Sequence, residues 1–102
     1  MGFKITIGKG FHVTFENGYT VSVQFGPGNY CQHHGRGVFA SDWFAENYAC
    51  GKEGSADAEV AVWASDGNLI QRPDFDGDTV QGYVSPEYVL KLMNWAAKQK
   101  KK

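Results

Sequence analysis

The most constraining feature of the sequence is a regular alternation of apolar and polar residues in the first 25 positions. It occurs in three stretches, at residues 3–7, 11–15 and 19–25. Successive side chains of an extended strand point to opposite faces, so a period of two gathers the apolar side chains of each stretch on one face. The alternation therefore predicts three half-buried β-strands.

Glycine-containing turns between these stretches predict how the strands pair. A three-residue loop at 16–18 keeps the apolar residues together on one face and places Gly18 where the backbone must be left-handed. A two-residue loop would mix the two faces. The pairs expected from the longer loop are Phe15–Tyr19, Val13–Val21 and Phe11–Val23. A similar loop at 8–10 predicts the pairs Ile7–Phe11, Ile5–Val13 and Phe3–Phe15.

The second half of the chain adds shorter strand patterns. Residues 58–64 predict a strand with Val60 and Val62 on one face, followed by a turn at 65–68. Residues 69–72 then predict a short return strand, which Pro73 ends. An acidic turn at 74–78 and a further strand within 79–84 complete this region.

Residues 85–97 carry the signature of an amphipathic helix. Ser85, Pro86 and Glu87 supply an N-cap hydroxyl, a proline at the first helical position and an acid in the first turn. Apolar residues then recur at steps of three and four. They are Val89, Leu92, Met93 and Ala96, with Leu90 and Ala97 widening the stripe. We expect this stripe to lie across the apolar side of the three N-terminal strands.

These elements predict an α+β fold: an antiparallel sheet of four to six strands, including the N-terminal three-stranded meander, with a C-terminal helix packed on one face. The length of 102 residues fits one domain at 1–97, followed by a lysine-rich tail at 98–102. Net charge is −1, and the lysines follow a helix end where cations suit the dipole, which disfavours nucleic acid as a partner. No apolar run is long enough to span a membrane.

The segment at 27–50 is the expected location of a binding site. It opens with a glycine-rich loop, and residues 41–49 fit either a short helix or an extended loop. Loops carried by a sheet often hold recognition residues, among which Tyr, Trp and Arg dominate contact energies. The expected contact residues are Asn29, Tyr30, Arg36, Trp43 and Tyr48.

Cysteine and histidine residues in the same segment leave several chemistries open. The residues are Cys31, His33, His34 and Cys50. Structural or free thiols are the favoured reading, because the spacing is not that of a usual zinc site. A zinc site, a Cys31–Cys50 disulfide and a Cys31 nucleophile activated by a histidine are the alternatives. Two cysteines are too few for a disulfide scaffold, which favours a reducing cytoplasm.

Four phrases of the sequence together resemble a group of small uncharacterised proteins encoded by bacteriophages and prophages. They are VSVQFG at 21–26, GNYC at 28–31, AEVAVW at 58–63 and GYVS at 82–85. The resemblance covers about half of the chain and transfers no activity and no functional residues. It implies an accessory protein of the bacterial cytoplasm that binds a host protein, for example a component of host defence.

The expected function is therefore a small, non-enzymatic protein that binds a host macromolecule and needs no cofactor. The alternative is a protein that binds a small molecule or zinc through the 27–50 loop. A Cys–His enzyme ranks third, because no complete catalytic set is visible in the sequence.

Overall fold

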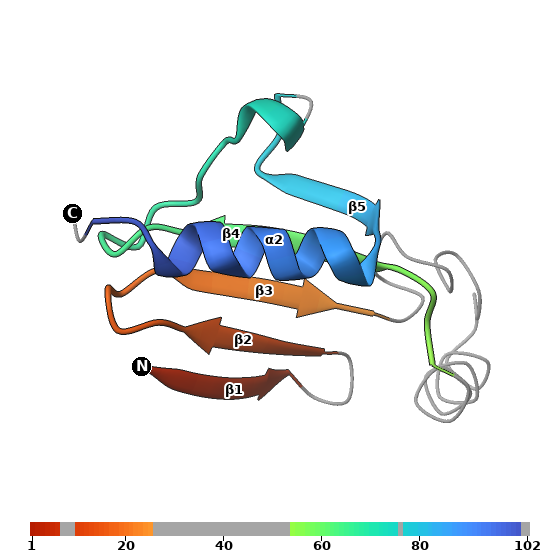
Figure 1. Ribbon diagram of the computed structural model, residues 1–102, viewed down its shortest axis with the longest axis horizontal. Helices are drawn as coiled ribbons and strands as arrows, with labels where there is room; N and C mark the ends of the chain where they lie inside the picture. The colour runs from red at the N-terminus through yellow and green to blue at the C-terminus, as the bar shows by residue number, and fades with distance from the viewer. Residues whose placement is uncertain (7–9, 26–53, 76, 101–102) are drawn as a thin grey trace.

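The structure is a computed structural model that describes residues 1–6, 10–25, 54–75 and 77–100 (Figure 1). Five strands of this part of the chain form one antiparallel sheet, in which each strand lies beside its neighbours in sequence. They are β1 (Gly2–Thr6), β2 (Gly10–Thr14), β3 (Thr20–Gln24), β4 (Ala58–Trp63) and β5 (Val80–Val84). One 3-10 turn, η1 (Pro73–Phe75), precedes β5, and the helix α2 (Pro86–Ala97) follows it. This arrangement confirms the predicted α+β fold.

The pairing of β2 with β3 is the one that the three-residue loop predicts. Val13 lies opposite Val21, and Phe11 lies opposite Val23. The N–H of Gly18 donates to the carbonyl of Phe15 at 2.9 Å, and Gly18 has a φ of +88°, as this loop requires. The apolar residues of both strands therefore share one face, where Val13 and Val21 are buried.

The predicted pairing of β1 with β2 is wrong by two residues. Phe3 lies opposite Val13 rather than Phe15, and Ile5 lies opposite Phe11 rather than Val13. A shift of two keeps every side chain on its face, so the apolar pattern cannot distinguish the two registers. Gly10, which was expected in the loop, is a strand residue paired with Gln24. It packs closely against β3, because a Cβ at this position would lie 2.0 Å from the carbonyl oxygen of Val23.

The strand predicted at 58–64 is confirmed, whereas the strand predicted at 69–72 is not. Only Leu69 forms a bridge, to Trp63, and the N–H of Ile70 donates to the carbonyl of Val62 at 2.8 Å. The rest of this side of β4 pairs with β5, which competes for the same edge. A bulge interrupts that pairing between Ala58 and Val60, and Tyr83 takes a left-handed conformation with φ 55°.

The helix α2 begins where the sequence predicts. The hydroxyl oxygen of Ser85 accepts a hydrogen bond from the backbone N–H of Tyr88 at 3.1 Å, and Pro86 occupies the first helical position. The C-terminal end of the helix is held by Asn17 in the β2–β3 turn. The side-chain Nδ2 of Asn17 donates to the carbonyl oxygens of Ala96 and Gln99, each at 2.8 Å.

The helix covers only part of the sheet. It packs on β3 and β4, and Figure 1 shows β1 and β2 extending beyond it. The prediction that α2 would lie across the three strands of the N-terminal meander is therefore wrong for β1, whereas Val13 of β2 is buried in the same core as Leu92 and Ala96. Leu92 and Ala96 are buried as expected, but Leu90 is 60% exposed and Ala97 is also exposed. These two residues lie around the helix axis from the buried face that Leu92 and Ala96 form.

The hydrophobic core lies between α2 and the strands that it covers. Its largest fully buried side chains are those of Phe75, Leu92, Val21, Val60 and Val62. The 3-10 turn contributes Phe75, so the connection between β4 and β5 also folds over the helix side of the sheet. Burial of each large apolar side chain contributes about 1.5–3 kcal/mol to stability.

Candidate functional site

The binding residues expected from the sequence all lie outside the described residues. They are Asn29, Tyr30, Arg36, Trp43 and Tyr48. The same holds for the thiol and imidazole groups considered as metal ligands or as a nucleophile, namely Cys31, His33, His34 and Cys50. The candidate site described below is therefore built from other residues.

Two further findings concern the described part of the chain. Within residues 1–6, 10–25, 54–75 and 77–100, no three His, Cys, Asp or Glu side chains lie close enough together to hold a metal ion. In the same part of the chain, no helix has the length and apolar character needed to cross a membrane.

The uncovered part of the sheet carries exposed apolar side chains. Phe3 is 77% exposed and Ile5 is 72% exposed, although both lie on the face of the sheet that α2 covers over β3 and β4. Their pairing with Val13 and Phe11 places them on this face. The rings of Phe3 and Phe11 meet edge to face, with centroids 6.3 Å apart. These three side chains form an apolar floor over β1 and β2.

The adjoining side of α2 is also apolar. Four residues follow one another at steps of four, three and four along the helix, so they form one stripe on its surface. They are Pro86, Leu90, Met93 and Ala97. A groove of about 250 Å³ contains Pro86 and Val89 of α2 together with Phe11 and Val23 of the sheet. Pro86 therefore lies beside Phe11, and the stripe that Pro86 begins forms the wall beside the floor.

We name the combined surface the apolar ledge. Its floor consists of Phe3, Ile5 and Phe11, and its wall consists of Pro86, Leu90, Met93 and Ala97. The sequence predicted that Met93, with Leu90 and Ala97 beside it, would lie on the apolar stripe that packs on the sheet, and it assigned Pro86 only to the start of the helix. The width of the apolar stripe on α2 could have revealed the ledge, because the stripe is wider than the surface that a helix buries when it packs on a sheet.

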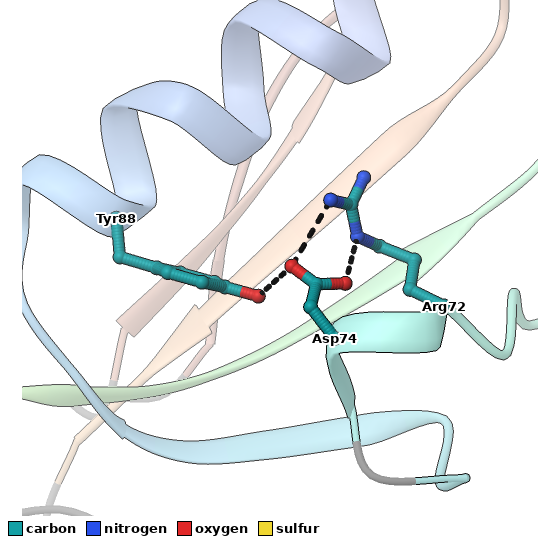
Figure 2. Close-up of polar contacts among 3 residues, drawn as sticks. All are labelled: Arg72, Asp74 and Tyr88. Carbon is teal, nitrogen blue, oxygen red and sulfur yellow. Dashed lines mark hydrogen bonds and ion pairs between the residues drawn. The ribbon is translucent and has the colours of Figure 1, made fainter.

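The opposite side of α2 is occupied by a polar cluster (Figure 2). Arg72 donates from Nε to Asp74 Oδ1 at 2.8 Å and from a terminal nitrogen to Oδ2 at 3.1 Å. The hydroxyl of Tyr88 donates to Asp74 Oδ2 at 2.5 Å. The guanidinium of Arg72 also lies over the ring of Trp95, 4.3 Å from its centroid. The cluster thus ties η1 and the residues before it to the helix.

The charges in this cluster stabilise one another. Hydrogen bonding to Arg72 lowers the pKa of Asp74, and the hydrogen bond to Asp74 raises the pKa of Arg72. Burial of its hydroxyl, followed by its hydrogen bond to Asp74, raises the pKa of Tyr88 to about 12. Near neutral pH the ion pair stays charged and Tyr88 stays protonated. This arrangement suits a structural clamp, because neither an acid nor a base is poised to exchange protons there.

The face of the sheet opposite α2 is polar and internally hydrogen-bonded. The hydroxyl of Thr6 donates to Gln24 Oε1 at 3.0 Å, and the hydroxyls of Thr14 and Thr20 lie 2.9 Å apart. Ser22, in the middle of this face, is 5% exposed. Among the described residues, the side-chain nitrogen of Gln24 on this face is buried without a hydrogen-bond partner. Phe3 and Ile5, the most exposed apolar side chains of the described strands, lie on the ledge.

Comparisons of the chain with protein-family models, with curated proteins and with solved structures find no match. The residues and geometry of the ledge are therefore the basis on which function is inferred.

Proposed function

We propose that the chain is a small, non-enzymatic binding protein that recognises another protein through the apolar ledge. The observation that supports this proposal is the exposure of three large apolar side chains, Phe3, Ile5 and Leu90, on the floor and wall of the ledge. Contiguous apolar patches on small proteins commonly mark interaction sites, because leaving them in water forfeits the free energy of burial.

The kind of partner follows from the resemblance to small phage and prophage proteins. That resemblance supports a host protein of the bacterial cytoplasm as the partner, and inhibition of host defence as one outcome of binding. The residues at 27–50 that the sequence favours would then add contacts to those of the ledge. Aromatic and arginine side chains there suit the role of energetic anchors.

The proposal is tested by affinity purification from a lysate of the cells in which the protein is naturally made. The wild-type chain is expected to retain a protein in stoichiometric amount. The double variant Phe3→Thr/Ile5→Thr, which keeps a β-favouring residue at each position, is expected to lose it. Leu90→Gln, which preserves helix propensity, is expected to weaken retention as well.

The matched control is Leu69→Thr, because Leu69 is 44% exposed and lies outside the ledge. This variant is expected to retain the partner as the wild type does. Equal retention by the double variant and the wild type would place recognition elsewhere. Failure of the wild type to retain any protein would contradict the proposed function itself.

A further inference from the structure

The shape of the apolar ledge limits what can occupy it. Its floor is two strands wide, and neighbouring strands lie about 4.8 Å apart, so the floor is about 10 Å across. An α-helix with its side chains has a diameter of about 10–12 Å. A second helix lying beside α2 would therefore cover β1 and the part of β2 around Phe11 that α2 leaves open.

The surface of α2 supports a helix in that position. Beside the apolar wall runs a polar stripe, whose residues are all exposed: Glu87, Lys91, Asn94 and Lys98. A helix in the same layer as α2 would bury the wall and leave this polar stripe in water. The buried stripe, the wall and the polar stripe follow one another around the helix. With a second helix beside α2, they would face the sheet, that helix and water, respectively.

Two other occupants fit these observations less well. A second copy that packed its own ledge face to face would set the polar stripe of α2 against Phe3 and Ile5, at a desolvation cost. A strand added to the free edge of β1 would extend the sheet but would leave Leu90 and Ala97 exposed. Only a helix beside α2 contacts the floor and the wall together.

One end of the ledge carries more basic than acidic groups, although Glu16, beside Asn17, also lies at that end. The C-terminal end of α2 carries Lys98 and Lys100, and it lies at the same end of the sheet as the amino group of Met1 (Figure 1). The shared location follows from the pairing of Gly2 with Thr14 and from the hydrogen bonds of Asn17 to the helix end. Glu87 lies at the other end of α2. An acidic end of the occupant would therefore suit the lysines.

We infer that the apolar ledge receives an amphipathic helix of the partner protein, which lies in the same layer as α2 with its acidic end near Lys98. This inference rests on the proposed function, and it specifies the form in which the partner is recognised. Helices that lay an apolar face into a groove do so through residues at three- and four-residue spacing.

The test is photo-crosslinking within the captured complex. Benzoylphenylalanine replaces Ile5 of the floor in one protein and Leu90 of the wall in another, and the crosslinked positions on the partner are mapped by mass spectrometry. Both probes are expected to reach one segment of the partner, at positions three or four residues apart. A probe that replaces Leu69 serves as the control and is expected to give no crosslink to that segment.

A synthetic peptide of the mapped segment provides the second measurement. The peptide is expected to gain helical circular dichroism on binding. Leu90→Gln and the double variant Phe3→Thr/Ile5→Thr are each expected to weaken its binding about tenfold, which corresponds to about 1.4 kcal/mol. Lys98→Glu is expected to weaken binding to a smaller extent, and Leu69→Thr is expected to leave it unchanged.

The outcomes distinguish this inference from the proposed function. Crosslinks from Ile5 at two-residue spacing, with none from Leu90, would show strand addition and overturn the helix alone. Crosslinks from both probes to a second copy of this chain would also overturn it. Crosslinks within the same molecule would show that the chain covers its own ledge, which would overturn both. Absence of any captured partner would contradict the proposed function before the crosslinks are read.

Discussion

Asn17 donates a hydrogen bond from its side-chain amide to the carbonyl of Ala96, 79 positions later in the sequence. The carbonyl of Ala96 also accepts from the backbone N–H of Gln99 at 3.3 Å, so Asn17 adds a second donor there and supplies one to the carbonyl of Gln99. Its own Oδ1 accepts from the N–H of Tyr19, which holds the β2–β3 turn. One side chain thus connects the meander to the end of α2.

Substitution of Asn17 by Ala is expected to destabilise the protein by about 1–3 kcal/mol, because the link between the β2–β3 turn and the helix end is lost and each of the two carbonyls loses a hydrogen-bond donor. Urea denaturation followed by circular dichroism measures the change. Asn94→Ala is the matched control, since Asn94 lies on the exposed polar stripe of the helix. An unchanged midpoint for Asn17→Ala would show that water replaces the amide without cost.

Two leucines two positions apart on α2 are expected to respond very differently to truncation. Leu92 is 2% exposed, so Leu92→Ala should cost about 2–5 kcal/mol through lost burial and the cavity left behind. Leu90 is 60% exposed, so Leu90→Ala should change the stability of the isolated protein by about 0.5 kcal/mol or less. A large loss of stability for Leu90→Ala would show that the wall is covered in the free protein.

The ion pair of Asp74 predicts a loss of stability in acid. Hydrogen bonding to Arg72 lowers the folded-state pKa of Asp74 below its ordinary value of 3.8. The contribution of this carboxylate is present above pH 3.8 and is lost as the pH falls through the lower folded-state pKa. Wild-type protein should therefore lose its stability advantage over Asp74→Asn in acid, as measured by thermal unfolding across pH. Glu16→Gln, outside the cluster, should show no matching convergence with the wild type.

Tyr88 predicts a second pH dependence at the alkaline end. Burial and the hydrogen bond to Asp74 raise the folded-state pKa of Tyr88 from 10.0 to about 12. Its contribution is present below pH 10.0 and is lost as the pH rises through about 12. Spectrophotometric titration should show a phenolate component near pH 12 that is missing in Tyr88→Phe. Tyr83→Phe, at an exposed position, should retain that component.

Several parts of the fold could be predicted because local patterns determine them. The alternation in the first 25 residues specifies which faces are apolar, and Gly18 specifies the β2–β3 loop. Ser85 and Pro86 specify the start of α2. Each of these depends on residues within a few positions of one another, so no knowledge of the rest of the chain is needed.

Other parts depended on contacts between distant residues. The register of β1 on β2 differs by two from the prediction, because both registers satisfy the same alternation. Residues 69–72 carry a strand-like pattern, but β5 takes most of the β4 edge that they would need. The Arg72–Asp74–Tyr88 cluster was missed because nothing in the local sequence brings Tyr88 to Asp74.

The sequence by itself determined which side chains are apolar, which face of each strand they occupy and how wide the apolar surface of α2 is. Only the tertiary structure decided where α2 lies on the sheet, and therefore which apolar residues became core and which became the ledge. The physical reason is that one helix spans about two strands, whereas the sheet has five. The position of α2 turns Leu92 toward the sheet, and Leu90, about 200° away around the helix, is therefore exposed.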